Sequence, residues 1–312
     1  MAYTRRDLGK IALSAVPAAT LLAKPNSKFG GVQIGIITYS FRAMSGKAED
    51  ILKNLVDLGL NSVEMMSEVA ESFAGAPSSG RLGSRTQLTP EQQEAQRRAV
   101  EERKKWRLSV SMDKYRALRS MYNDAGVQID AFKLGLTGAM SDDEYDYCFN
   151  VAKALGAGHV TMELPSQEDL TRRIGEFAGK HKIFVGYHNH TQVTLRSWDT
   201  ALAQSKYNGI NLDVGHFTEA ISASPIPFIK QYHDRIQSFH LKDKKYASNG
   251  GGNAPWGQGQ TPLKEVLQLM AREKYKWPAN IELEYDIPEG STVMAELAKC
   301  VQFCKDALAL KR

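Results

Sequence analysis

Short apolar runs alternate along the chain with longer stretches that have helical periodicity. Each run has the length and apolar content of a buried strand. The expected strands cover residues 32–39, 61–66, 127–135, 158–164, 182–190, 209–214, 236–241 and 279–285. The expected helices cover residues 46–59, 90–125 (with a break), 141–156, 167–180, 198–206, 225–234, 262–274 and 291–310.

Eight strands alternating with eight helices is the count of a closed (β/α)8 TIM barrel, an α/β fold. We therefore expect residues 30–312 to form a single barrel domain. A doubly wound open sheet is the alternative. The segment after the first strand, ITYSFRAMSG (37–46), lacks the Gly-rich phosphate-binding pattern that such sheets use, which favours the barrel.

Side chains capable of binding a metal lie where five of the expected strands end. They are Glu163, His188, Asp213, His240 and Glu282. In a parallel barrel the carboxyl ends of the strands converge on one mouth, where active sites are built. The sequence therefore predicts that these five side chains meet there.

Mixed carboxylate and imidazole ligands suit one divalent cation, such as Mn²⁺, Mg²⁺, Co²⁺ or Zn²⁺. The two-residue period of a strand puts His190 on the same face as His188, and Glu284 on the same face as Glu282. Each pair can supply one metal ligand and one supporting partner or base.

Five motifs carry a resemblance to a known family: YHNH (187–190), LDVGH (212–216), FHLKD (239–243), GQG (257–259) and IELEY (281–285). With these motifs the chain resembles the xylose-isomerase-like TIM-barrel superfamily, which includes the sugar phosphate isomerase/epimerase family. The resemblance runs from about Gln33 to the last helix. That superfamily also contains inosose dehydratases and repair nucleases of the endonuclease IV type.

The resemblance implies roles for several residues. In the epimerase branch the metal is held by Glu, Asp, His and Glu from the fifth to eighth strands, and three of these positions are Asp213, His240 and Glu282 here. His216 matches a histidine that contacts substrate in that branch.

The fifth strand departs from the family pattern, because His188 replaces a glutamate that is both ligand and base. Either His188 becomes the fourth ligand, or Glu163 from the neighbouring strand supplies the missing carboxylate. We favour Glu163, since a third negative charge stabilises a hard dication more.

The chemistry that the resemblance implies is removal of a proton beside a carbonyl, through an enediolate intermediate. We expect a metal-dependent isomerase or epimerase of a carbohydrate. Its catalytic candidates are Glu163, His188 and Glu282. Three alternatives remain open: a lyase or dehydratase acting on a keto-sugar or 3-oxidised glycoside, an endonuclease IV-like phosphoesterase, and a non-catalytic exported sugar-binding barrel.

Two segments rich in Gly, Ser and Pro, residues 74–86 and 246–260, are expected to be mobile loops at the barrel mouth. Trp256 in the second segment offers a face on which a sugar ring can stack, and Lys242 lies where it can orient substrate. The expected substrate-binding residues are His190, His216, Lys242, Trp256 and Glu284.

The first residues resemble a twin-arginine export signal. Arg5 and Arg6 precede an apolar run, residues 11–23, that is too short to span a bilayer comfortably. We therefore predict a signal peptide over residues 1–23, a periplasmic location, and no stable membrane anchor after cleavage. An ordinary amphipathic N-terminal helix is the alternative.

Composition adds little to the choice of partners. The net charge is +5, and the densest basic stretch, residues 97–107, is interleaved with glutamates. Such a pattern favours a solvated helix face, so we expect no nucleic acid as partner. The family resemblance implies a small carbohydrate as partner. The pattern leaves the oligomeric state open. The three cysteines are expected to be core-facing thiols.

Overall fold

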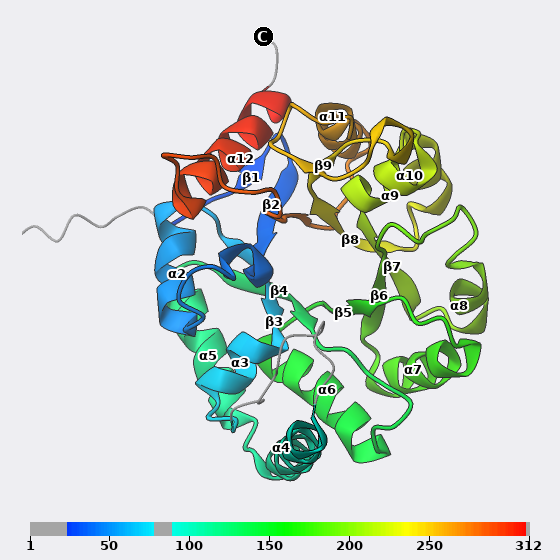
Figure 1. Ribbon diagram of the computed structural model, residues 1–312. Coiled ribbons are helices and arrows are strands. Elements are labelled where there is room, and N and C mark those ends of the chain that lie inside the picture. Colours follow the sequence, from blue (N-terminus) through cyan, green and yellow to red (C-terminus); the bar gives the residue numbers. More distant parts are fainter. Residues whose placement is uncertain (1–23, 78–88, 310–312) are drawn as a thin grey trace, which may run out of the picture.

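The alternating elements close into a parallel barrel with helices around its outside (Figure 1). A computed structural model describes residues 24–77 and 89–309. The barrel strands are β2 (Val32–Ile37), β3 (Ser62–Met66), β4 (Gln128–Lys133), β5 (His159–Glu163), β6 (Phe184–His188), β7 (Asn208–Asp213), β8 (Ile236–Leu241) and β11 (Ala279–Ile281). Strand β2 pairs in parallel with β3 on one side and with β11 on the other, which closes the ring. The predicted barrel is confirmed.

The helices largely follow the predicted ranges. They are α2 (Ala48–Asp57), α4 (Pro90–Ser109), α5 (Asp113–Asp124), α6 (Asp142–Leu155), α7 (Glu168–His181), α8 (Asp199–Gln204), α10 (Ile226–Tyr232), α11 (Leu263–Glu273) and α12 (Val293–Leu308). The break expected within residues 90–125 separates α4 from α5. Short additional elements are β1 (Lys28–Phe29), η1 (Thr38–Phe41), β9 (Asp243–Lys244), η2 (Ala247–Asn249) and β10 (Asn253–Ala254).

Two helices that the sequence pattern did not predict, α3 (Ser67–Phe73) and α9 (Val214–Ile221), start directly after β3 and β7. No turn residues separate strand from helix at these points, so the apolar run conceals the boundary. The Oδ1 atom of Asp213 caps α9 by accepting the backbone N–H of His216 at 2.8 Å. This cap fixes the Asp213 carboxylate at the mouth of the barrel.

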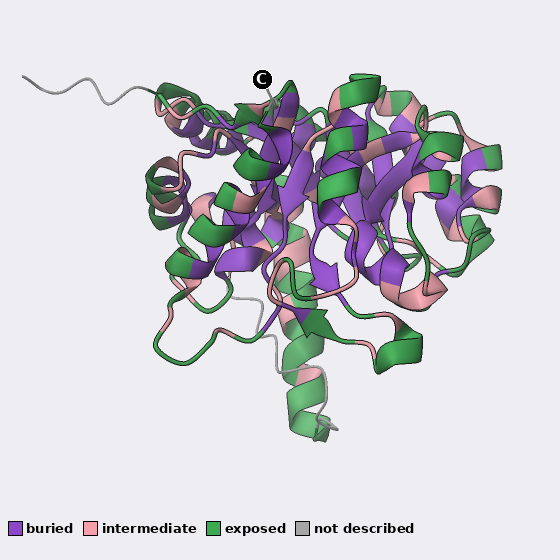
Figure 2. Cartoon of the chain, turned by 90° about the horizontal axis from the view of Figure 1, so that it is seen from above, coloured by how far each residue is buried: buried purple, intermediate pink, exposed green. Residues whose placement is uncertain are grey.

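The core lies between the strands and the inner faces of the helices, where buried residues dominate (Figure 2). Leu55, Phe149 and Leu267 are among the side chains that are fully buried there. The three cysteines are free and buried, Cys148 on α6 and the other two on α12. The expectation of core-facing thiols is confirmed.

Helix α4 lies on the outside, and none of its described residues is fully buried. It is tied to the barrel by Arg103 and Arg107, whose guanidinium groups lie 2.6 and 2.8 Å from the carboxylate of Glu71 on α3. Glu71 is only 1% exposed and also accepts a hydrogen bond from Tyr147 at 3.0 Å. A buried carboxylate thus holds two guanidinium groups.

The predicted signal segment, residues 1–23, lies outside the described residues, as does most of the predicted loop at 74–86. Within the part of the chain that the structure describes, we find no helix with the length and apolar character needed to cross a membrane.

Candidate metal centre

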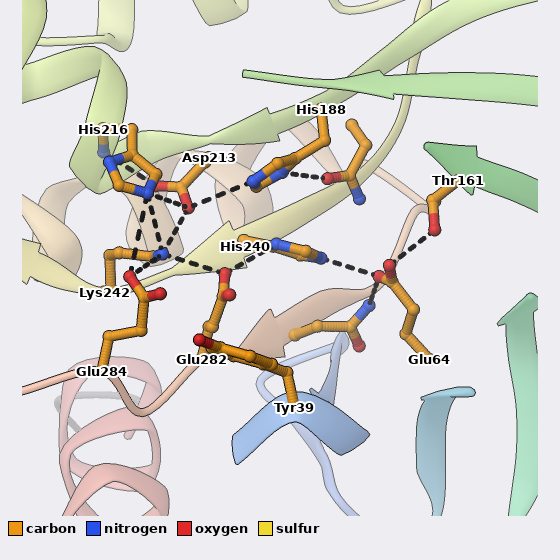
Figure 3. Close-up of polar contacts among 12 residues, drawn as sticks. Tyr39, Glu64, Thr161, His188, Asp213, His216, His240, Lys242, Glu282 and Glu284 are labelled. Carbon is orange, nitrogen blue, oxygen red and sulfur yellow. Dashed lines mark hydrogen bonds and ion pairs between the residues drawn. The ribbon is translucent and has the colours of Figure 1, made fainter. Parts of the chain in front are cut away.

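Four side chains from successive strand ends meet at the mouth of the barrel. They are His188, Asp213, His240 and Glu282, and each offers one ligand atom within 4.8 Å of the others. The strand register produces this meeting, since Asp213 pairs with His240 across β7 and β8, and Asn280 pairs with His240 across β11 and β8. All four residues are buried, and their side chains point toward one another (Figure 3).

The donor atoms of this cluster are short of hydrogen bonds. Within the described chain, Asp213 Oδ2, His240 Nδ1 and Glu282 Oε2 are buried without a hydrogen-bond partner. The Nε2 atom of His188 lies 4.0 Å from Asp213 Oδ2, and His240 Nδ1 lies 2.8 Å from Glu282 Oε2 without hydrogen-bond geometry. Because buried polar atoms are nearly always paired, these converging nitrogen and oxygen atoms fit a divalent cation.

Glu64 on β3 orients His240. Its Oε2 lies 2.9 Å from His240 Nε2, and the carboxylate also accepts hydrogen bonds from Thr161 Oγ1 at 2.6 Å and Asn280 Nδ2 at 3.0 Å. Burial would raise the pKa of Glu64, but His240 and Lys133 lower it to about 2. The ionised carboxylate therefore holds Nε2–H of His240 and directs Nδ1 at the other three donors, as carboxylate–histidine pairs do around metals.

Lys242 supplies a buried positive charge beside the cluster. Its Nζ lies 3.0 Å from Asp213 Oδ2, 3.1 Å from Glu282 Oε2 and 2.6 Å from Glu284 Oε2. Burial would lower the pKa of Lys242, but these carboxylates raise it, so the side chain is an ammonium. His216 Nε2, 3.1 Å away, accepts from this ammonium, since burial and Lys242 lower the pKa of His216 to about 3.

Glu163 lies outside the four-residue cluster. Its Oε1 is 3.0 Å from Lys133 Nζ and its Oε2 is 2.8 Å from His190 Nε2. Both Glu163 and His190 are about half exposed. The structure thus brings His188, not the favoured Glu163, among the potential ligands, and it makes Glu163 and His190 a pair at the rim.

A cavity opens beside that pair. It has a volume of about 260 Å³ and lies between the β5–α7 and β6–α8 connections. Its polar lining includes Glu168, His190, Gln192 and Ser197. A small polyhydroxylated molecule can therefore lie with one end at His190.

The segment over residues 246–260, expected to be mobile, is anchored. The carboxylate of Asp243 accepts the backbone N–H groups of Gly257, Gly259 and Thr261 at 2.8, 2.9 and 3.1 Å. A Cβ at position 259 would lie 2.1 Å from Asp243 Oδ1, so the close approach requires glycine. This segment, which we call the anchored loop, forms a fixed wall of the mouth.

Trp256 in the anchored loop packs edge-on against Phe303 of α12, with ring centroids 5.5 Å apart. Among the described residues, the Trp256 ring contacts an aromatic ring of this helix and none of the metal cluster. The structure therefore gives Trp256 a packing contact, while its predicted stacking on a sugar ring stays a prediction.

Sequence reasoning did not identify Glu64, Lys133 or Asn211. The available signal for the first two was a charged residue inside an apolar strand run, SVEMM for Glu64 and QIDAFK for Lys133. Such a residue is costly to bury unless it is paired, so it marks a polar network.

Comparison with known proteins agrees with the fold. A search of curated proteins finds no significant match. Among solved structures, the probable 3-DHS dehydratase AsbF from Bacillus anthracis is 16% identical, covers 87% of this chain and 98% of its own, and has a TM-score of 0.63. A structure named L-ribulose 3-epimerase is 13% identical, with coverages of 89% and 94% and a TM-score of 0.60.

A sugar phosphate isomerase/epimerase from Parabacteroides distasonis is 16% identical, with coverages of 88% and 95% and a TM-score of 0.58. At these identities the likeness shows the fold alone. The profile of one family, described as xylose isomerase-like TIM barrel, matches residues 52–303, which is most of the chain. The protein belongs to the xylose isomerase-like TIM barrel family.

Proposed function

We propose that this protein is a metal-dependent isomerase or epimerase that acts on a carbohydrate through an enediolate intermediate. The observation that carries the proposal is the convergence of three buried donor atoms without hydrogen bonds, on Asp213, His240 and Glu282, with Nε2 of His188. A divalent cation bound there would polarise a substrate carbonyl and acidify the neighbouring C–H group.

Residues of the chain would then remove the proton and bind the substrate. His190 donates Nε2–H to Glu163, which leaves its Nδ1 available to accept a proton from the substrate carbon. The hydrogen bond to Glu163 raises the pKa of His190, which favours proton uptake. Lys242 and His216 lie beside the same cluster, and the His216 ring is 4.9 Å from the ring of His190, so His216 can contact a substrate bound at His190.

A lyase is the second candidate, and one observation favours it. The Glu163–His190 pair is a base on one side of the cluster, and His188, at the position of the family's second base, has its Nδ1 hydrogen-bonded to Asn211 at 2.9 Å. Epimerisation returns the proton from the opposite face, whereas elimination needs only one removal. The first half-reaction is the same in both cases.

Exchange of substrate hydrogen with solvent tests the shared step. The protein is loaded with Mn²⁺, Co²⁺ or Zn²⁺ and incubated in D₂O with a panel of keto-sugars and 3-oxidised glycosides. Deuterium incorporation beside the carbonyl, followed by mass spectrometry, is expected with metal and should disappear after treatment with EDTA. The products then separate isomerisation from elimination.

Two variants sharpen this test. Asp213→Asn removes one donor of the cluster and should abolish exchange, while Asp169→Asn changes an exposed carboxylate of α7 and should leave it intact. Absence of exchange with every metal-loaded sample would refute the enediolate proposal. Sugar binding without exchange would instead support the non-catalytic barrel.

Export by the twin-arginine route remains a separate proposal, supported by Arg5 and Arg6 in the sequence. Replacing both by lysine should retain the protein in the cytoplasm of a bacterial host. An unchanged periplasmic fraction would contradict the proposal.

A further inference from the structure

A row of buried polar side chains lies beneath the metal centre, one layer deeper in the barrel. His188 Nδ1 lies 2.9 Å from Asn211 Oδ1, Asn211 Nδ2 lies 2.6 Å from Ser238 Oγ, and Ser238 Oγ lies 2.9 Å from His159 Nε2. Asn211 and Ser238 are fully buried, and His159 is 5% exposed. The row thus links strands β6, β7, β8 and β5 through side chains alone.

The strand register explains the position of this row. His188 pairs with Asn211, and Asn211 pairs with Ser238. Asn211 and Ser238 each precede a residue of the metal cluster by two positions, so they share its face of the sheet. Gly186 makes room for the row, because a Cβ there would lie 3.1 Å from the Cβ of Asn211.

The direction of the hydrogen bonds decides whether Nε2 of His188, the nitrogen that faces the cluster, carries a proton. A neutral imidazole carries one N–H. With Nδ1–H donating to Asn211 Oδ1, the Nε2 atom presents its lone pair toward Asp213. The reverse direction would place an N–H on Nε2, 4.0 Å from Asp213 Oδ2, where it makes no hydrogen bond. A buried donor left unpaired costs about 1–3 kcal/mol, which favours the first arrangement.

We propose that the Asn211–Ser238–His159 row fixes His188 as a nitrogen ligand, and that the resulting centre of two imidazoles and two carboxylates selects a first-row transition-metal dication over Mg²⁺. Imidazole suits zinc, cobalt and iron, whereas Mg²⁺ prefers oxygen ligands and retained water. Lys242 adds to this preference, since its ammonium offsets part of the negative charge that a hard cation needs. The inference rests on the metal-binding part of the proposed function.

The tautomer of His188 is the first readout, and it needs neither metal nor substrate. Long-range ¹H–¹⁵N correlation spectra of the metal-free protein are expected to show His188 protonated on Nδ1. Ser238→Ala and Asn211→Leu should reduce this preference. Ser62→Ala, another buried serine outside the row, is the matched control and should leave it unchanged. An Nε2–H tautomer in the unaltered protein would overturn the proposal.

Metal affinity is the second readout. Competition with a chromophoric chelator gives the affinities for Zn²⁺ and Mg²⁺ in the same variants. Loss of the row should weaken Zn²⁺ binding by about 10–100-fold, the range seen when supporting hydrogen bonds around a metal are removed. His188→Glu should lower the ratio of Zn²⁺ to Mg²⁺ affinity by about tenfold or more. An unchanged ratio in His188→Glu would refute the selection argument.

Circular dichroism identifies variants that fail to fold. If Asn211→Leu is unfolded, Ser238→Ala carries the test, because it removes one hydroxyl and leaves the partner of His188 in place. The outcome is separate from that of the deuterium-exchange experiment. Metal selection can fail while exchange occurs, and exchange can fail while the centre still prefers Zn²⁺.

Discussion

Binding of a divalent cation should release one proton from His240. Burial alone would lower the pKa of this imidazole, but Glu64 and Glu282 raise it to about 10 in the metal-free site. At pH 7 His240 is therefore protonated on both nitrogens, with Nε2–H facing Glu64 and Nδ1–H beside Glu282. A cation needs the electron pair of Nδ1, so binding must displace this proton.

The size of the effect follows from the gap between that pKa and the pH of the measurement. At pH 7 the gap is about 3 units, and each unit is worth about 1.36 kcal/mol, so proton competition weakens metal binding by about 4 kcal/mol. Since the pKa lies above this range, His240 stays protonated as the pH falls, and the concentration of competing protons rises tenfold for each unit. The apparent affinity should therefore drop about tenfold for each unit between pH 8 and pH 6.

Isothermal titration in buffers with different ionisation enthalpies counts the protons. The unaltered protein should release about one proton per metal ion at pH 7. Glu64→Gln removes one of the two charges that raise the pKa of His240, so fewer protons should be released. His233→Gln changes an exposed histidine and is the matched control, with an unchanged count. A count near zero, with an affinity that does not vary between pH 6 and pH 8, would refute the reasoning.

Three further predictions concern single residues. Glu163→Gln should leave metal affinity unchanged in a chelator titration, because Glu163 lies outside the metal cluster, and a loss of affinity would contradict this. The same change should slow deuterium exchange by about 10²–10⁴-fold, because it weakens His190 as a base. Asp243→Ala should destabilise the anchored loop, since three backbone N–H groups each lose a hydrogen bond worth about 1–3 kcal/mol. Amide hydrogen exchange in the loop should become faster, and unchanged protection would contradict the prediction. Glu71→Leu leaves two largely buried arginines without their carboxylate and should lower the free energy of unfolding in urea by about 3–5 kcal/mol. The exposed control Glu94→Leu should lower it by less than about 1 kcal/mol, and equal losses would contradict the burial argument.

The barrel and three of the four residues of the candidate metal centre are predictable from the sequence for a physical reason. Parallel strands buried on both faces leave continuous apolar runs, and the polar residue at the end of each run marks the mouth. Asp213, His240 and Glu282 each stand at such an end, and the structure brings them together. Their meeting depends on the register of neighbouring strands, which the closed barrel imposes.

The remaining features depend on side-chain direction, which spacing does not determine. Glu163 also stands at a strand end, but Lys133 and His190 draw its carboxylate away from the cluster. Charge alone favours a third carboxylate at the metal, but Lys133 and His190 offset the charge of Glu163 where it lies. Asn211 gave no signal of its own, because a single amide in a strand resembles any other polar position until its partner is known.

Lys242 has a consequence for how the protein matures. Its ammonium lies between Asp213 and Glu282, so the two buried carboxylates have a counter-ion built into the chain before any metal binds. In small zinc domains folding and metal binding occur together, because the ligands cannot be held close without the ion. We therefore expect assembly of the barrel and binding of a cation to be separable events. The chain could then be completed in one compartment and loaded in another.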